Sequence, residues 1–223
     1  MTVYPTLVIH SVFSNLLSRR KLPRVLRQFR IDVHEIKPQQ LRPLPPNESL
    51  ELIDKTVIDI LESSGAPKLN LICMDSSGLL GLNLLRHRQG HRKIHTLITL
   101  GTPFRGSEKF QRFSNTANLT TWAKHLCHES DFIKSLHKPY LFPKKPARII
   151  SIYGNNDPLA DRERASIPEA EILQAPVNQW PFGHFQLTTS DANIKLIVSQ
   201  LTDNIATLNT DSNDIITHKI SAQ

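Results

Sequence analysis

The sequence is poor in cysteine and has no long apolar run. Its two cysteines, Cys73 and Cys127, are too few for the disulfide framework of a small secreted domain. No apolar run approaches the roughly 20 residues that a transmembrane helix needs. Residues 1–10 also lack the basic and apolar regions of a secretory signal, and their pattern favours a strand. We therefore expect a cytoplasmic protein with no transmembrane segment, in which both cysteines are free thiols.

The remaining composition is typical of one globular domain. The chain has 223 residues, of which 39% are hydrophobic and 21% are charged. This length suits a single domain with one sizeable core. We assign residues 1–208 to the domain, with an insertion at about 107–146, and residues 209–223 to a polar C-terminal tail.

Positive charge exceeds negative charge, with a formal net charge of +7 and a pI of about 9.6. The excess is concentrated in residues 19–30 and 86–93. Basic patches attract nucleic acid, anionic lipid or acidic proteins, but Lys and Arg are also common on solvated helix faces and at helix C-termini. No recognisable nucleic-acid-binding module accompanies the charge. We expect solvated helix surfaces that can contact anionic surfaces, without sequence-specific binding of nucleic acid.

Short apolar runs alternate with amphipathic segments along the chain. The runs predict strands, and the amphipathic segments predict helices. This alternation is typical of a parallel sheet that is covered on both faces. We therefore predict an α/β fold, with a mostly parallel, doubly wound sheet of about six strands and a short lid-like insertion. The predicted strands are Thr6–His10, Ile31–Ile36, Leu69–Cys73, Ile94–Leu100, Arg148–Tyr153 and Ala170–Leu173, and the predicted helices are Ser14–Phe29, Ser49–Ser63, Ser77–His87 and Asp191–Ile205.

Proline and glycine predict where these elements end. Pro23 predicts a break or kink inside the first helix. The four prolines in residues 38–47 predict a loop. Gly90 is expected to close the third helix.

The most informative segment is residues 68–79, which read Lys-Leu-Asn-Leu-Ile-Cys-Met-Asp-Ser-Ser-Gly-Leu. The pattern predicts a buried strand, a sharp turn and the start of a helix. That is the setting of the nucleophile elbow G-x-S-x-G. Read in register, Asp75 takes the place of the nucleophile, and Cys73 and Ser77 take the places of the two glycines.

Five segments, in order from about Thr6 to Ile205, resemble the bacterial lipase/esterase branch of the α/β-hydrolase family. They resemble its oxyanion loop, its nucleophile elbow, its T-L-G-T-P-H-x-G-S stretch (with Phe104 for the usual His), its acid turn and its Gly-His loop. These segments are Leu7–Ser11, Leu69–Leu84, Leu97–Ser107, Ser151–Asp157 and Gly183–Leu187.

The resemblance implies an α/β-hydrolase fold and a triad in the order nucleophile, acid, histidine. It implies a small ester-like or lipid-like substrate or ligand, and no cofactor and no metal. The residues that it assigns are, for catalysis, Asp75, Asp157, His184 and the alternative Ser76; for the oxyanion hole, the amides of Val12 and Ser76; and for substrate contact, His10, Ser11 and Phe104.

The departures from the family pattern leave four readings open. Asp75 has no hydroxyl proton for His184 to remove, so it is a weak acyl nucleophile. It can instead form an alkyl ester, as in haloalkane dehalogenases and epoxide hydrolases, although those enzymes usually have Trp where Ser76 stands and the latter add lid tyrosines.

The elbow can be shifted so that Ser76 is the nucleophile, or a group such as Asp75 or His184 can act as general base on water. Finally, hydrolysis can be lost while a binding pocket is kept.

We favour altered, weak or lost ester hydrolysis on a hydrolase scaffold. Three replacements support this interpretation, because the glycines that let the backbone turn at the elbow and the oxyanion loop have become Cys73, Ser77 and Ser11. A non-catalytic binding or regulatory protein, and an Asp-nucleophile hydrolase that acts on epoxides or haloalkanes, are the alternatives.

Overall fold

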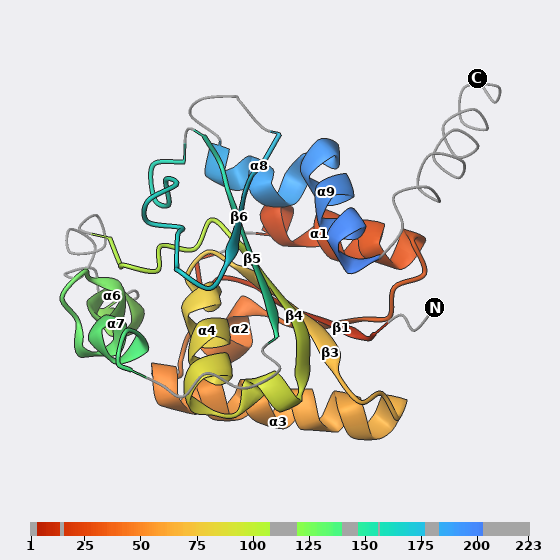
Figure 1. Cartoon of the computed structure of the whole chain (residues 1–223), viewed down its shortest axis with the longest axis horizontal. Helices are drawn as coiled ribbons and strands as arrows, with labels where there is room; N and C mark the ends of the chain where they lie inside the picture. Colours follow the sequence, from red (N-terminus) through yellow and green to blue (C-terminus); the bar gives the residue numbers. More distant parts are fainter. Residues whose placement is uncertain are drawn as a thin grey trace.

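The computed structural model of the chain describes residues 4–13, 16–107, 120–139, 147–155, 157–176 and 183–202. Its centre is a six-stranded sheet in the order β2-β1-β3-β4-β5-β6, with every neighbouring pair parallel. The predicted doubly wound parallel sheet is confirmed (Figure 1). The strands are β1 Thr6–Ile9, β2 Val33–Ile36, β3 Leu69–Met74, β4 Ile94–Leu100, β5 Arg148–Tyr153 and β6 Glu171–Gln174.

Helices cover both faces of the sheet (Figure 1). One face carries α1 (Leu16–Gln28), α8 (Gly183–Thr189) and α9 (Asp191–Leu201). The other carries α2 (Pro38–Leu41), α3 (Pro46–Ser64) and α4 (Ser77–His87), which is followed by the short 3₁₀ helix η1 (Gly90–Arg92). No helix among the described residues is long and apolar enough to cross a membrane.

Successive side chains along each strand point to opposite faces of the sheet, so the core forms two clusters. Leu7 and Ile9 of β1 point toward α3 and α4, whereas Val8 points toward α1 and α9. All six residues of β3 are buried, as expected for a central strand of a parallel sheet that is covered on both sides. The start of α4 is therefore fixed by a strand that is packed on both faces.

The insertion packs against the core over its described part. It contains α6 (Thr120–Leu126) and α7 (Asp131–Leu136), and α7 contacts α4. Trp122 of α6 is buried, and its ring nitrogen donates to the carbonyl oxygen of Leu41 at 3.2 Å. Residues 108–119 and 140–146 of the insertion and the predicted tail at 209–223 lie outside the described residues.

Three predictions made from proline and glycine differ from the structure, each for a local reason. Residues 38–47 are not one loop, because Pro38 and Pro46 occupy the first positions of α2 and α3, where a helix needs no amide donor. Of the predicted break or kink at Pro23, the break does not occur, because α1 runs through the proline and buried Leu22 and Leu26 anchor it to the sheet on either side. Helix α4 has the predicted bounds Ser77–His87, but the residue that turns the chain after it is Gln89, which takes the left-handed conformation, and Gly90 begins η1.

Candidate active site

The site begins at the turn between β3 and α4. Asp75 has a φ of 51°, an uncommon left-handed conformation for a non-glycine residue. Its amide donates to the carbonyl oxygen of Leu100 at 2.8 Å, and its own carbonyl oxygen accepts from the Thr102 hydroxyl at 2.8 Å. Ser76 has already returned to right-handed helical backbone, with φ −58° and ψ −25°. Two bonds from the neighbouring strand and loop therefore hold the strained residue in place.

The sharp turn forms with Ser77 and Cys73 at the positions of the two glycines in the elbow motif. The Ser77 hydroxyl donates to the carbonyl oxygens of Met74 (2.8 Å) and Ile9 (2.9 Å), so it joins β3 to β1. Cys73 is fully buried, and burial raises the pKa of its thiol. Gly78 is the position with no room, because a Cβ there would lie 2.0 Å from Oγ1 of Thr102.

Asp157 and His184 form a second part of the site. Asp157 follows β5, and its Oδ1 accepts from the amides of Leu159 (2.8 Å) and Ala160 (3.1 Å). Its Oδ2 lies 2.6 Å from Nδ1 of His184, in the first turn of α8. Two backbone donors and one imidazole thus orient the Asp157 carboxylate.

The His184 imidazole links the Asp157–His184 pair to the turn after β3. Nε2 of His184 lies 3.9 Å from Oδ1 of Asp75. Three side chains separated by 82 and 27 positions in the sequence (157 − 75 and 184 − 157) therefore meet at the C-terminal edge of the sheet. This convergence was expected from the sequence, and the distances confirm it. The catalytic roles of the three residues stay predictions.

Ser11 and Ser76 lie against the Asp75 carboxylate. The Ser11 hydroxyl donates to Oδ2 of Asp75 at 2.6 Å and lies 3.2 Å from the Ser76 hydroxyl. Oδ1 of Asp75 is buried and has no hydrogen-bond partner among the described residues. One carboxylate oxygen is thus held by Ser11, and the other faces His184.

The electrostatics of the site couple Asp75 to His184. Burial raises the pKa of Asp75, although the His184 charge and the Ser11 hydroxyl oppose that rise. Burial alone would lower the pKa of His184, but the hydrogen bond to Asp157 and the charges of Asp75 and Asp157 together raise it to about 9. His184 is therefore an imidazolium at neutral pH.

The remaining predicted residues lie around this centre. Val12 follows Ser11, and its carbonyl oxygen accepts from Nε of Arg42 at 2.7 Å, which ties the predicted oxyanion loop to the end of α2. His10 is fully buried, with Nε2 2.9 Å from Oε2 of Glu35. Phe104 is also fully buried in the core. Contact of His10, Ser11 or Phe104 with a substrate stays a prediction.

Sequence reasoning missed two supporting residues in the segment after β4. Gly101 has a φ of 60°, and a Cβ there would lie 2.9 Å from Oδ2 of Asp157 and 3.0 Å from the His184 ring. The missing side chain lets that pair approach the turn. Thr102 supports Asp75 from behind through the hydrogen bond described above. The Gly-Thr-Pro motif was the available signal, but it gives no role to either residue.

The comparisons with known proteins support the fold. No protein-family model matches the sequence, and neither does any curated protein. The chain is similar to the structure of Bacillus licheniformis lipase BlEst2 in mature form, with 15% identity, a TM-score of 0.71 and coverage of 89% of this chain and 92% of that chain. It is also similar to MGS-MChE2, an α/β-hydrolase enzyme from the metagenome of lagoon sediments from Mar Chica, Morocco, with 13% identity, a TM-score of 0.60 and coverage of 88% and 90%.

A third similar structure is that of the ydeN gene product from B. subtilis, with 13% identity, a TM-score of 0.62 and coverage of 90% of this chain and 100% of that chain. At such low identities the likeness establishes the fold alone. The chain has the α/β-hydrolase fold, and its structural neighbours include lipases and esterases.

Proposed function

We propose that this chain is a hydrolase-type protein related to lipases and esterases, in which ester hydrolysis is weak or lost because Asp75 occupies the nucleophile position. The observation that carries the proposal is the left-handed backbone of Asp75 at the turn between β3 and α4, with His184 Nε2 3.9 Å from its carboxylate. A strained strand-to-helix turn presents the nucleophile in this fold. Small ester-like or lipid-like molecules are the proposed ligands.

The backbone supports Asp75 over Ser76 as the residue at the nucleophile position. In a nucleophile elbow, the strained residue is the one whose side chain stands above the sheet edge. Here the strain falls on Asp75, whereas Ser76 has ordinary helical dihedrals. The shifted reading would require the strain to fall one residue later.

Two further features argue against acyl transfer. Ser11 donates to Oδ2 of Asp75, so the carboxylate engages the loop whose Val12 amide is our proposed oxyanion donor. His184, with its pKa raised to about 9, carries a proton at neutral pH and has no lone pair to offer as a base. The resting site thus has a carboxylate at position 75 where acyl transfer needs a hydroxyl, and its imidazole is not available as a base.

Restoring the hydroxyl tests the proposal. Wild type should hydrolyse short-chain p-nitrophenyl esters weakly or not at all, and Asp75→Ser should gain activity. The substitution removes a negative charge beside His184, which lowers the pKa of the imidazole toward its ordinary value and lets it act as base. An intact oxyanion hole is worth roughly two to three orders of magnitude in rate, so a measurable gain is expected if the Val12 and Ser76 amides are aligned.

Two controls accompany the assay. Asp75→Ala should gain nothing, because it removes the charge without adding a nucleophile. Robust ester turnover by the wild type that survives Asp75→Ala and disappears in Ser76→Ala would contradict the proposed register. Failure of Asp75→Ser to gain activity would instead indicate that the oxyanion loop around Ser11 no longer supports hydrolysis.

A second candidate function rests on the unpartnered oxygen of Asp75. Oδ1 is buried, accepts no hydrogen bond among the described residues and faces His184. Such a carboxylate oxygen can attack a saturated carbon: a C–O bond forms to Asp75 while the carbon–halogen bond breaks and halide leaves, or while an epoxide C–O bond breaks and its oxygen takes a proton from His184. Water then adds to the Asp75 ester carbonyl, which releases an alcohol and restores the carboxylate.

Charge changes support this sequence of steps. Once Asp75 is an ester, it no longer raises the pKa of His184, so the imidazole becomes a better base for the attacking water. His184→Gln should then trap the ester after incubation with a panel of haloalkanes and epoxides, seen as a mass increase of the intact protein. Asp75→Asn is the control and should show no increase. Absence of an adduct and of turnover across the panel would leave ester chemistry or ligand binding as the function.

A further inference from the structure

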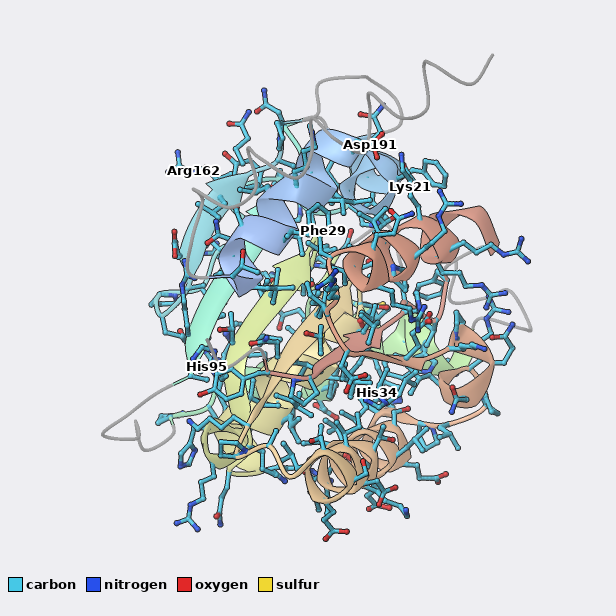
Figure 2. All side chains as sticks on the ribbon, turned by 90° about the vertical axis from the view of Figure 1, so that its right-hand side faces the viewer. Lys21, Phe29, His34, His95, Arg162 and Asp191 are labelled. Carbon is cyan, nitrogen blue, oxygen red and sulfur yellow. The ribbon has the colours of Figure 1, made fainter. Side chains whose placement is uncertain are left out.

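A cavity lies between α1, the end of β2 and α2. Its volume is about 690 Å³, and none of Asp75, Asp157 and His184 lines it. This size falls within the range of small-molecule sites, roughly 300–1,000 Å³. Figure 2 faces this side of the molecule, with Lys21 marking α1 and His34 marking β2. The lining residues are Arg19, Arg20, Pro23, Arg27, Glu35, Lys37, Gln39 and Gln40.

Four cations line the cavity against one carboxylate, and that carboxylate is already engaged. Oε1 of Glu35 accepts from Arg27 at 2.8 Å, and Oε2 lies 2.9 Å from Nε2 of His10. The Glu35 charge is therefore compensated by Arg27, and its other oxygen is engaged by the buried His10 ring. Lys21 points away and pairs with Asp191 of α9 at 3.0 Å (Figure 2).

The other three cations of the cavity have capacity for a ligand. Arg19 donates through one guanidinium nitrogen to Oε1 of Gln39 at 2.9 Å, which orients it across the cavity toward α2. Arg20 and Lys37 are exposed, and no hydrogen bond or ion pair ties the guanidinium of Arg20 or Nζ of Lys37 to another described residue. Burial lowers the pKa of His10, the hydrogen bond and charge of Glu35 oppose this, and the charges of Arg19 and Lys37 lower it further, so both cations lie near enough to act on this ring.

We propose that this cavity binds a small molecule that carries a phosphate or pyrophosphate group. Guanidinium groups match phosphate oxygens with two parallel donors, and a lysine ammonium adds a point charge. Arg19 and Arg20 of α1 and Lys37 at the start of α2 provide both kinds of donor. A ligand with one carboxylate would leave some of these cations uncompensated. A phosphate group carries a charge near −2 and balances more of them. The proposal is independent of the chemistry at Asp75.

Calorimetric titration of the whole chain with inorganic pyrophosphate at low ionic strength tests it. Arg20→Gln/Lys37→Gln removes two cations from the cavity and should weaken binding by about tenfold or more, since each is a charge-assisted contact. The matched control is Arg88→Gln/Arg92→Gln. It removes the same charge from a different basic cavity of about 490 Å³, which Asp54, His87 and Lys93 also line, and it should change the affinity by less than about twofold.

Equal losses in both double variants would overturn the proposal, because they would show attraction to net charge alone, and so would an absence of pyrophosphate binding by the wild type. Phosphatidic acid vesicles, compared with phosphatidylcholine vesicles, form a separate arm. Binding to the anionic vesicles without any binding of pyrophosphate would assign these cations to a membrane surface and contradict a soluble ligand. Pyrophosphate should also shift the His10 ring resonances in the wild type and in the control variant, but not in the cavity variant.

Discussion

The proton balance among Asp75, Asp157 and His184 decides what each residue can do. Both oxygens of Asp157 are engaged, because two backbone amides and the His184 imidazole use them. His184 lies between two carboxylates that outweigh the effect of burial and keep it protonated. Asp75 is left with one held oxygen and one open oxygen. An imidazolium beside an open carboxylate fits the proposed loss of acyl transfer, and it also fits the second candidate function, attack on a saturated carbon.

The raised pKa of His184 predicts how stability depends on pH. Its ordinary value is 6.5, and in the folded protein it is about 9. Because the folded value is higher, the contribution of His184 is fully present below pH 6.5 and is lost as pH rises through about 9. Urea unfolding of wild type and His184→Gln across this range should show their difference shrinking by on the order of 2 kcal/mol.

Asp75→Asn provides the control for this measurement. It removes one of the two carboxylates that raise the pKa of His184 in the folded protein. That pKa should therefore fall below about 9, and the stabilising contribution of His184 should be lost at a lower pH than in the wild type. A difference between wild type and His184→Gln that stays constant across the range would contradict the ion pairing described for the site.

Some of this chemistry could be predicted from the sequence, and some could not. The order Asp75, Asp157, His184 and the rule that parallel strands end at one edge were enough to place three distant residues together. The contact between Ser11 and Asp75 was not predictable, because it depends on rotamers in a loop. The link from His10 to Glu35 crosses from β1 to β2, so it follows only from the register of those strands.

Among the elements, strands and long helices were predicted well because their patterns are strong. The six buried or half-buried runs alternate with helices, and all six strands lie where they were expected to within about two residues. Short helices were missed. Helix α8 has seven residues, too few for a clear amphipathic period, so His184 was expected in a loop although it lies in the first turn of this helix.

Close packing of α4 against the segment after β4 gives a prediction at this scale. A Cβ at Gly78 would lie 2.0 Å from Oγ1 of Thr102, the group that holds the Asp75 carbonyl. Gly78→Ala should therefore push α4 or Thr102 aside and reduce the free energy of unfolding by about 1–3 kcal/mol. Thermal or urea unfolding measures the loss.

Gly154→Ala is a matched control, because the nearest atom to its added Cβ would lie 3.4 Å away and its backbone is not left-handed. It should cost clearly less than Gly78→Ala. Equal effects of the two substitutions would mean that α4 can shift at little cost and that the turn at Asp75 is less firmly held than its contacts indicate.

For the whole molecule, the packed core is built from side chains other than Asp75, Asp157 and His184. Two apolar clusters, one on each face of the sheet, hold the six strands, and Asp75 belongs to neither cluster. This explains how a chain 15% identical to a lipase covers 89% of its own length on that structure. Shared fold therefore sets where a reaction would occur, while the residue at the turn sets which reaction it would be.

The net charge of +7 gives the last prediction. Helix α1 and the segment after α4 carry most of the excess, but several of these cations are already paired, as Arg27 is with Glu35 and Lys93 with Asp54. Duplex DNA should consequently bind only weakly and lose affinity steeply as salt rises, because such binding comes from counterion release. Fluorescence anisotropy with two unrelated duplexes, from low to physiological salt, should give equal affinities that fall together. Tight binding at physiological salt that favours one duplex would contradict this, since it requires side chains that read base edges in addition to a positive surface.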